Sequence, residues 1–235
     1  MHGPYSITLA DILRQRLAFW PYWSVILTFV LAGVAALAVD LPLARRAREH
    51  AWPKAVTEQL QRAEVFGYGI TVGVILLVVV VLDPEKRSIM PRVALMVFGA
   101  GLAADGVKLL MARIRPRDFE FQGNVWQTFD RWLPFGAGGS KFHSFPSGHT
   151  ATAVGLAVAL SALYPRGRWL FGLFAVLAGC QRIVSGAHYP SDVCLAAALG
   201  WFVAVGIGRG SLGWLGFDRW ERASGSRLSK AASLG

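Results

Sequence analysis

Long uninterrupted apolar runs are the feature that most constrains how this chain folds. Leu17–Val39 holds 23 residues without a charged side chain, and Phe66–Leu82 holds 17. The apolar core of a bilayer is about 30 Å thick and needs roughly 20 helical residues to cross it, so the second run lies near the lower limit. Charged residues make up 16% of the chain, below the roughly 25% usual for soluble proteins. The sequence therefore predicts an integral membrane protein.

Six apolar segments predict an all-α fold. They are Leu17–Val39, Phe66–Leu82, Val93–Ala112, Thr150–Tyr164, Trp169–Arg182 and Val193–Gly208. No internal repeat and no low-complexity linker separates them, so we expect residues 1–235 to form one domain. The expected architecture is an integral membrane bundle of about six transmembrane helices, followed by a basic C-terminal tail over residues 209–235.

One connection is much longer than a plain link between neighbouring helices. Residues 113–145 separate the third helix from the fourth. This stretch carries seven aromatic side chains: Phe119, Phe121, Trp126, Phe129, Trp132, Phe135 and Phe142. Because aromatic residues gather at the headgroup level of membranes, we expect an interfacial lid that meets lipid tails. An ordered loop that packs its own aromatics is the alternative. Residues 51–64 are expected to form an amphipathic surface helix.

The formal net charge of +10 indicates an anionic partner. Lys and Arg are spread through short loops and form no single basic face, which argues against nucleic acid and favours anionic lipid headgroups and substrates. Cys180 and Cys194 lie inside apolar runs and are expected to pack as small apolar residues. Oligomeric state stays open.

The first apolar run has some features of a signal peptide, since Arg14 and Arg16 precede it and an A-x-A pattern ends it at Ala38. The run exceeds the roughly 7–15 residues of a signal-peptide core, so a retained helix is expected. Basic residues are almost equally numerous on the two sides, but both very short loops are basic, which favours a cytoplasmic N-terminus. The predicted location is the inner membrane, with the site described next on the extracytoplasmic face.

Three cations fall at helix ends that meet on one membrane face. Lys108 and Arg115 are seven residues apart, two helical turns, near the end of the third helix, and Arg182 is near the end of the fifth. A charge in a span costs roughly 2.5–3.5 kcal/mol or more, so it needs a reason. The natural ligand of such a cluster is a multiply charged anion, and the planar fork of Arg suits phosphate.

The starts of the fourth and sixth helices carry the remaining polar residues. Ser147 can cap the fourth helix, where Gly148 and free N–H groups favour an anion; the alternative is an ordinary capped helix start. His149 follows directly. His188 and Asp192 are four residues apart. If the turn between them brings them together, the carboxylate accepts a proton from one ring nitrogen and leaves the other nucleophilic. A structural pair and a metal site are the alternatives.

Taken in order, these residues resemble the three-part signature of the type 2 phosphatidic acid phosphatase superfamily. The signature reads Lys108-x6-Arg115-Pro116, then Pro146-Ser147-Gly148-His149, then Arg182-x5-His188-x3-Asp192, and the resemblance covers roughly residues 105–208. One departure is Gln181, where Ser is common in the family. The resemblance implies a membrane lipid phosphatase that needs no metal and no cofactor.

The same resemblance implies a role for each residue. His188 attacks phosphorus and forms a phosphohistidine, Asp192 orients it, and His149 protonates the leaving group and then activates water. The non-bridging oxygens are held by Lys108, Arg115, Ser147, Gly148 and Arg182. Among the neighbours, Asp105 is expected to pair with Lys108, and His143 to be a loop residue without a role. Arg113 and Arg117 are expected to face solvent, with recognition of a second phosphate as the alternative.

Several functions remain possible for such a site. A phosphotransferase or a vanadate-dependent haloperoxidase uses the same scaffold, although haloperoxidases of this signature are soluble. A non-catalytic anion transporter or lipid-binding protein needs the cations but not two histidines and a carboxylate. The lipid itself is undetermined: phosphatidate, phosphatidylglycerol phosphate, a polyprenyl diphosphate and lipid A phosphates all fit.

Overall fold

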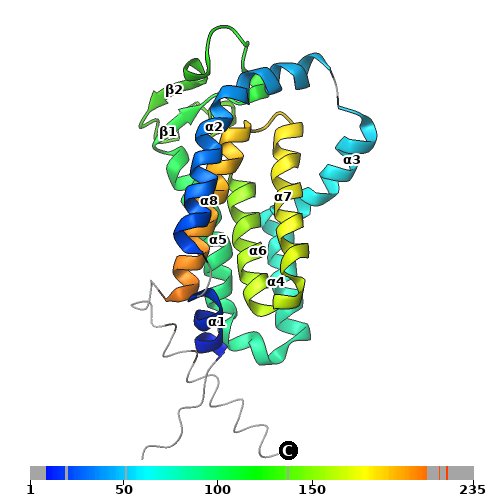
Figure 1. Cartoon of the computed structure of the whole chain (residues 1–235), viewed down its shortest axis with the longest axis vertical. Coiled ribbons are helices and arrows are strands. Elements are labelled where there is room, and N and C mark those ends of the chain that lie inside the picture. The colour runs from blue at the N-terminus through cyan, green and yellow to red at the C-terminus, as the bar shows by residue number, and fades with distance from the viewer. Residues whose placement is uncertain are drawn as a thin grey trace, which may run out of the picture.

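The computed structural model describes residues 9–18, 21–50, 52–136 and 138–210, together with Phe217 and Glu221. It is an elongated helical bundle, with α1 (Leu9–Ala18) at one end and a small β-hairpin at the other (Figure 1). Of the predicted basic tail, residues 209–235, only Arg209, Gly210, Phe217 and Glu221 lie within the described residues.

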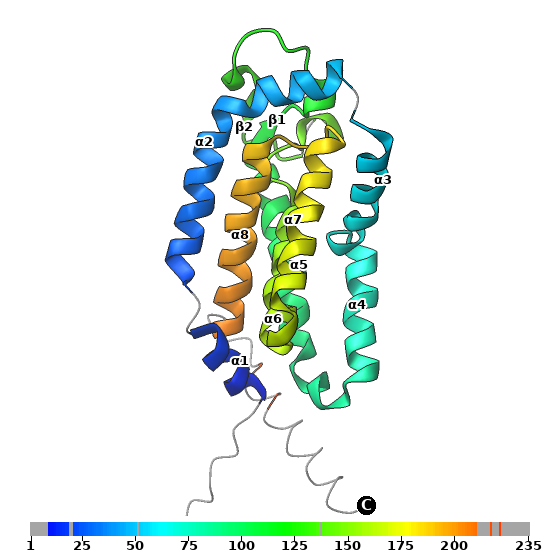
Figure 2. The same ribbon diagram turned by 45° about the vertical axis from the view of Figure 1, so that its right-hand side comes forward.

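All six predicted apolar segments contain a helix. These helices are α2 (Tyr22–Glu49), α4 (Gly69–Leu82), α5 (Met90–Lys108), α6 (Gly148–Leu163), α7 (Arg168–Val184) and α8 (Pro190–Arg209). The bounds predicted for the first segment, Leu17–Val39, are wrong. Leu17 belongs to α1, and α2 continues ten residues beyond Val39. The extension carries Pro42, a residue type that kinks helices, and its last turns cross the upper end of the bundle (Figures 1 and 2).

Two further elements lie between these helices. Residues 54–63 form α3 (Lys54–Ala63), which confirms the helix expected there. The all-α prediction is corrected by a two-stranded antiparallel sheet of β1 (Met111–Arg113) and β2 (Phe129–Trp132). Short 3-10 turns and irregular loops make up the rest of the described part of the long connection. Of its aromatics, Phe119 and Phe121 are buried while Trp126, Trp132 and Phe135 are exposed, so its function as a lid stays a prediction.

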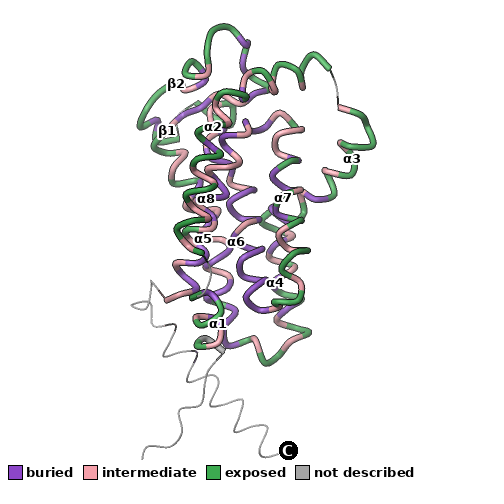
Figure 3. Tube along the Cα trace, in the orientation of Figure 1, coloured by how far each residue is buried: buried purple, intermediate pink, exposed green. Residues whose placement is uncertain are grey.

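The centre of the bundle is α6, which is buried along almost its whole length (Figure 3). It packs against α5, α7 and α8, and α2 lies along α8. Close packing depends on small residues: a Cβ at Gly200 of α8 would lie 2.6 Å from the carbonyl oxygen of Ala151. Glycine at that position lets the two backbones approach, as is common between helices in membranes.

The outer faces of the bundle are apolar. Large exposed hydrophobic side chains lie on three helices that are on its outside: Trp23, Leu27, Leu31, Ile70, Val74, Leu77, Val81, Trp169, Leu173 and Val176. By length and composition, α2, Pro84–Lys108 and α8 are able to cross a membrane. Lys54–Phe66 and Gly69–Leu82, bent by 57°, together qualify as a fourth span, and α6 is apolar but shorter. A membrane protein fits these surfaces, and the count of six spans stays a prediction.

The packing at Gly200 predicts a position-specific loss of stability. Gly200→Ala should lower the free energy of unfolding by about 1–3 kcal/mol, since its new Cβ meets backbone that cannot swing away. Gly172→Ala on α7 is the matched control, because no atom lies within 4 Å of that Cβ position. Thermal unfolding of the two variants in detergent checks this, and equal melting temperatures would contradict the packing described.

Candidate active site

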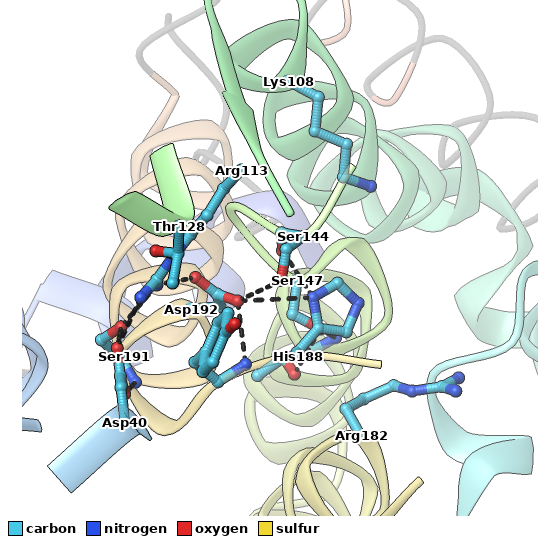
Figure 4. Close-up of polar contacts among 12 residues, drawn as sticks. Asp40, Lys108, Arg113, Thr128, Ser144, Ser147, Arg182, His188, Ser191 and Asp192 are labelled. Carbon is cyan, nitrogen blue, oxygen red and sulfur yellow. Dashed lines mark hydrogen bonds and ion pairs between the residues drawn. The ribbon is translucent and has the colours of Figure 1, made fainter. Parts of the chain in front are cut away.

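Helix ends and loops far apart in the sequence meet at one place in the bundle. Lys108 ends α5, Arg182 is in the last turn of α7, and Asp192 is in the first turn of α8. Ser147 is the residue before α6, and its hydroxyl accepts a hydrogen bond from the Thr150 N–H (3.4 Å). The cap expected at Ser147 is therefore present. These ends lie in the same part of the bundle, and Figure 4 shows Lys108, Ser147, Arg182 and Asp192 in one close-up.

His188 lies in the turn before α8 and is 4% exposed. Its Nδ1 is 2.5 Å from the backbone carbonyl oxygen of Ser144. Since a carbonyl only accepts, Nδ1 carries the proton and Nε2 has a free lone pair. The Oδ2 atom of Asp192 lies 3.9 Å from Nδ1, too far for a hydrogen bond. The expected direct hydrogen bond between these two residues is thus replaced by one to Ser144.

Asp192 is connected to His188 through Ser144 instead. Its Oδ2 accepts from the Ser144 hydroxyl (2.6 Å) and from the Tyr189 N–H (2.9 Å), while Oδ1 pairs with Arg113. Asp192 is fully buried. Ser144 donates its hydroxyl to Asp192 and accepts from His188 Nδ1 through its carbonyl (Figure 4). The Asp192 carboxylate therefore holds Ser144 in place, and Ser144 in turn holds the imidazole of His188.

The expectation that Arg113 faces solvent is wrong, since this residue is 0% exposed. Its guanidinium pairs with Asp192 and, at 2.7 Å, with Asp40 of α2. The Nε atom donates to Thr128 Oγ1 (3.0 Å), and the rings of Phe129 and Tyr189 lie 4.5 and 4.2 Å from the guanidinium carbon. Arg113 ends strand β1, and the hairpin directs its side chain into the bundle.

Asp40 is the second residue that sequence reasoning missed. It is fully buried, and its carboxylate accepts from the Ser191 N–H (3.0 Å) and the Ser191 hydroxyl as well as from Arg113. A signal for it exists in the sequence: an acidic residue placed directly after a 23-residue uncharged run needs a buried partner. The partner itself, 73 residues away, could not be found without the fold.

The charges of the three predicted cations, Lys108, Arg115 and Arg182, all act on His188. Lys108 Nζ is 3.2 Å from where a Gly148 Cβ would be, and it pairs with Asp105 at 2.8 Å, which confirms that expected pair. Among the described residues, the Nε atoms of Arg115 and Arg182 are buried and have no hydrogen-bond partner. Donors left unpaired in a cationic cluster fit an anionic ligand.

Burial and charge together determine the protonation of His188. Burial lowers the pKa of its imidazole well below the usual value, the hydrogen bond to Ser144 raises it, and the positive charges of Arg115, Lys108 and Arg182 lower it further. His188 is therefore a neutral imidazole at neutral pH.

His149 lies in the first turn of α6, within the same set of charges. Its ring stacks on Tyr68, with centroids 6.0 Å apart, and its Nε2 is 3.7 Å from Oε1 of Glu64. Glu64 follows α3 and also bonds Arg182 at 2.5 Å. Sequence reasoning missed it, because an acidic residue at the end of an amphipathic helix usually faces water. Among the described residues, no group of three or more His, Cys, Asp or Glu side chains is placed to hold a metal ion.

Comparison with known proteins adds a family to this geometry. The sequence model of the PAP2 superfamily matches residues 91–211. A lipid A 1-phosphatase from Rhizobium johnstonii is 40% identical over 104 residues, 44% of this chain and 40% of the relative. A lipid A 1-phosphatase from Rhizobium etli matches equally over 44% of this chain and 42% of its own length. The alignment thus covers less than half of the length of these curated relatives.

Two solved structures share the fold. Aquifex aeolicus LpxE superposes with a TM-score of 0.53 at 22% identity, covering 71% of this chain and 93% of that one. A transmembrane PAP2 type phosphatidylglycerolphosphate phosphatase from Bacillus subtilis superposes with a TM-score of 0.56 at 19% identity, covering 83% and 94%.

The network around Arg113 predicts a large cost for its removal. Arg113→Ala should lower the free energy of unfolding by about 3–5 kcal/mol, because it leaves Asp40 and Asp192 buried without their shared cation. Arg117→Ala is the control: its side chain is 49% exposed and pairs only loosely with Asp118, so a change of about 0–1 kcal/mol is expected. Chemical or thermal unfolding in detergent measures the free energy of unfolding of both variants. Similar losses in the two would contradict a stabilising role of the buried Arg113 network.

Proposed function

The chain belongs to the PAP2 superfamily, and we propose that it is a membrane lipid phosphatase that works through a phosphohistidine intermediate. The observation that carries this proposal is the state of His188: a buried, neutral imidazole whose Nδ1 is fixed by Ser144, with three cations around it. A nucleophile of this kind is of use only against an anionic electrophile that the cations bind. A phosphate ester meets that description.

In the first half of the proposed reaction, His188 Nε2 attacks phosphorus and the bond to the ester oxygen breaks. Lys108, Arg115 and Arg182, with Ser147 and the Gly148 N–H at the start of α6, hold the non-bridging oxygens and neutralise their charge. The leaving alkoxide is strongly basic, so His149 donates a proton to it. Asp192 stabilises the charge that develops on His188, through Ser144.

In the second half, His149 takes a proton from water, and the resulting hydroxide attacks the phosphohistidine. The phosphorus–nitrogen bond breaks, free phosphate leaves, and His188 returns to its neutral form. No metal enters this scheme, because the cations and the helix N-terminus provide the charge that a metal would supply. A phosphotransferase differs only in that a hydroxyl other than that of water accepts the phosphoryl group.

The setting we propose is the inner membrane, with all six apolar helices spanning it and the active site on the extracytoplasmic side. The exposed apolar side chains on α2, α4 and α7 support contact with lipid tails. The exposed Trp126, Trp132 and Phe135 of the long connection support a position at the headgroups. A substrate whose acyl chains stay in the bilayer can then present its phosphate to the site.

Lipid A carrying a 1-phosphate is the first substrate to test, since the relatives at 40% identity are named lipid A 1-phosphatases. Phosphatidate, phosphatidylglycerol phosphate and a polyprenyl diphosphate complete the panel. Phosphate release by the purified protein in detergent should occur with at least one lipid and survive a metal chelator. His188→Ala should reduce turnover at least about 10³-fold, as removal of a nucleophile does, while phosphate still binds. Retained turnover in this variant would contradict the nucleophile assignment.

The lowered pKa of His188 has a signed consequence for pH. The unfolded imidazole has a pKa of about 6.5, and the folded one is lower, so acidification below about 6.5 protonates the unfolded state first. The free energy of unfolding should therefore decrease as the pH is lowered below about 6.5. In ¹⁵N-histidine NMR spectra, the His188 resonance is identified by its absence from the spectrum of His188→Ala. At pH 5.5 this resonance should still be that of a neutral imidazole ring. A titration midpoint near 6.5 would contradict the burial described.

A further inference from the structure

Asp40 is a buried acidic residue that joins two helices at the site. It lies in α2, outside the residues 91–211 that the family model matches. Its Oδ1 accepts the Ser191 N–H at 3.0 Å, and its Oδ2 accepts the Ser191 hydroxyl and, at 2.7 Å, Arg113 Nη2. Ser191 is in the first turn of α8, where backbone N–H groups have no partner within the helix. Asp40 therefore caps α8 from a neighbouring helix, and each of these hydrogen bonds is donated to it, as suits an ionised carboxylate.

Arg113 lies between two carboxylates. Its Nη2 atom pairs with Asp40 and its Nη1 atom with Asp192, and all three side chains are 0% exposed. One guanidinium with two ionised carboxylates leaves a buried net charge of −1. If Asp40 were neutral, the single positive charge of Arg113 would cancel the charge of Asp192. The excess negative charge beside His188 therefore depends on Asp40.

The proposed reaction needs a negative charge next to His188. The proton on Nδ1 is donated to the carbonyl of Ser144, which cannot take it up as a base. When Nε2 bonds to phosphorus, the ring therefore becomes a cationic imidazolium. The three cations of the site oppose this positive charge, whereas Asp192 Oδ2, 3.9 Å from Nδ1, favours it. Such interactions are stronger in a protein than in water, because the effective dielectric constant is lower.

We propose that Asp40 is a positioning residue for the reaction at His188. It offsets the positive charge of Arg113, so that the negative charge of Asp192 is left to stabilise the imidazolium. The inference rests on the proposed function. The effect of Asp40 is indirect, since it reaches His188 through those two residues.

This role affects the two halves of the reaction differently. In the first half the Nε2–phosphorus bond forms, the phosphorus–oxygen bond to the lipid breaks and the ring gains a positive charge. In the second half water attacks, the Nε2–phosphorus bond breaks and the ring becomes neutral again. Loss of the negative charge at Asp40 should slow the first half and leave the second half as fast or faster. A purely mechanical link between α2 and α8 predicts instead that both halves slow down.

Rapid-quench kinetics with a ³²P-labelled substrate lipid separates the two halves. Asp40→Asn keeps the shape of the side chain and removes its charge, so phosphohistidine should form about tenfold more slowly, while its hydrolysis is not slowed. Asp40→Glu keeps the charge in a side chain that fits less well, and should form the intermediate faster than Asp40→Asn. Asp130→Asn is the matched control, because Asp130 is an exposed residue of β2 that pairs with its neighbour Arg131; both rates should stay unchanged.

A chemical probe tests the same claim without a lipid. Diethyl pyrocarbonate is an uncharged electrophile, and attack of His188 Nε2 on its carbonyl carbon expels ethyl carbonate and again makes the ring cationic. Peptide mass spectrometry gives the rate of carbethoxylation at His188 alone. This rate should be about tenfold lower in Asp40→Asn than in the unaltered protein or in Asp130→Asn. Asp40→Ala is a second neutral variant, expected to show the same loss if Asp40→Asn does not fold.

Two kinds of result would overturn the proposal. One is an equal loss of rate in both halves of the reaction, or an Asp40→Asn variant that forms the intermediate faster than Asp40→Glu, since either result assigns Asp40 a mechanical role. The other is a rate of carbethoxylation at His188 that does not change when the charge of Asp40 is removed. If the unaltered protein acts on none of the lipids, the proposed function fails, but the carbethoxylation rates still decide whether Asp40 acts on His188.

Discussion

Two buried carboxylates, Asp40 and Asp192, share the guanidinium of Arg113, and the active site depends on this arrangement. Each charge is 0% exposed and would be strongly destabilising alone, but together with Ser191 and Thr128 the three make a satisfied network. The network ties α2, the β1–β2 hairpin and α8 to one another. Asp192 is therefore rigid, and through Ser144 it holds the imidazole of His188 in one tautomer.

The remaining cations have only solvent-accessible partners among the described residues: Lys108 pairs with Asp105 and Arg182 with Glu64. Lys108, Arg115 and Arg182 lie near His188, while the only carboxylate described on Arg182 is the accessible Glu64. The protein thus has two sets of charges, with His188 between them. One is the buried structural network of Asp40, Arg113 and Asp192, and the other is the cationic set of Lys108, Arg115 and Arg182. Such a division suits phosphoryl transfer, where catalysis is mainly positioning and neutralisation of charge.

The sequence predicted the helices and the signature residues because both follow from local rules. Apolar runs locate the helices, and Lys108, Ser147 and Arg182 are at helix ends that any bundle of this order brings together. Arg113 was placed wrongly because a two-stranded hairpin, set by pairing between residues 16 to 21 positions apart, directs it inward. Ser144 and Glu64 were missed because their roles come from a backbone carbonyl and from the bend between α3 and α4, neither of which leaves a pattern in the sequence.

The central claim is that His188 becomes covalently phosphorylated, and trapping that species tests it most directly. Purified protein is mixed with a ³²P-labelled substrate lipid, quenched with alkali within one turnover, and the labelled peptide is mapped. We expect an alkali-stable, acid-labile label on His188 that is absent from His188→Ala. Release of phosphate without any labelled histidine, or a label on His149, would contradict the account.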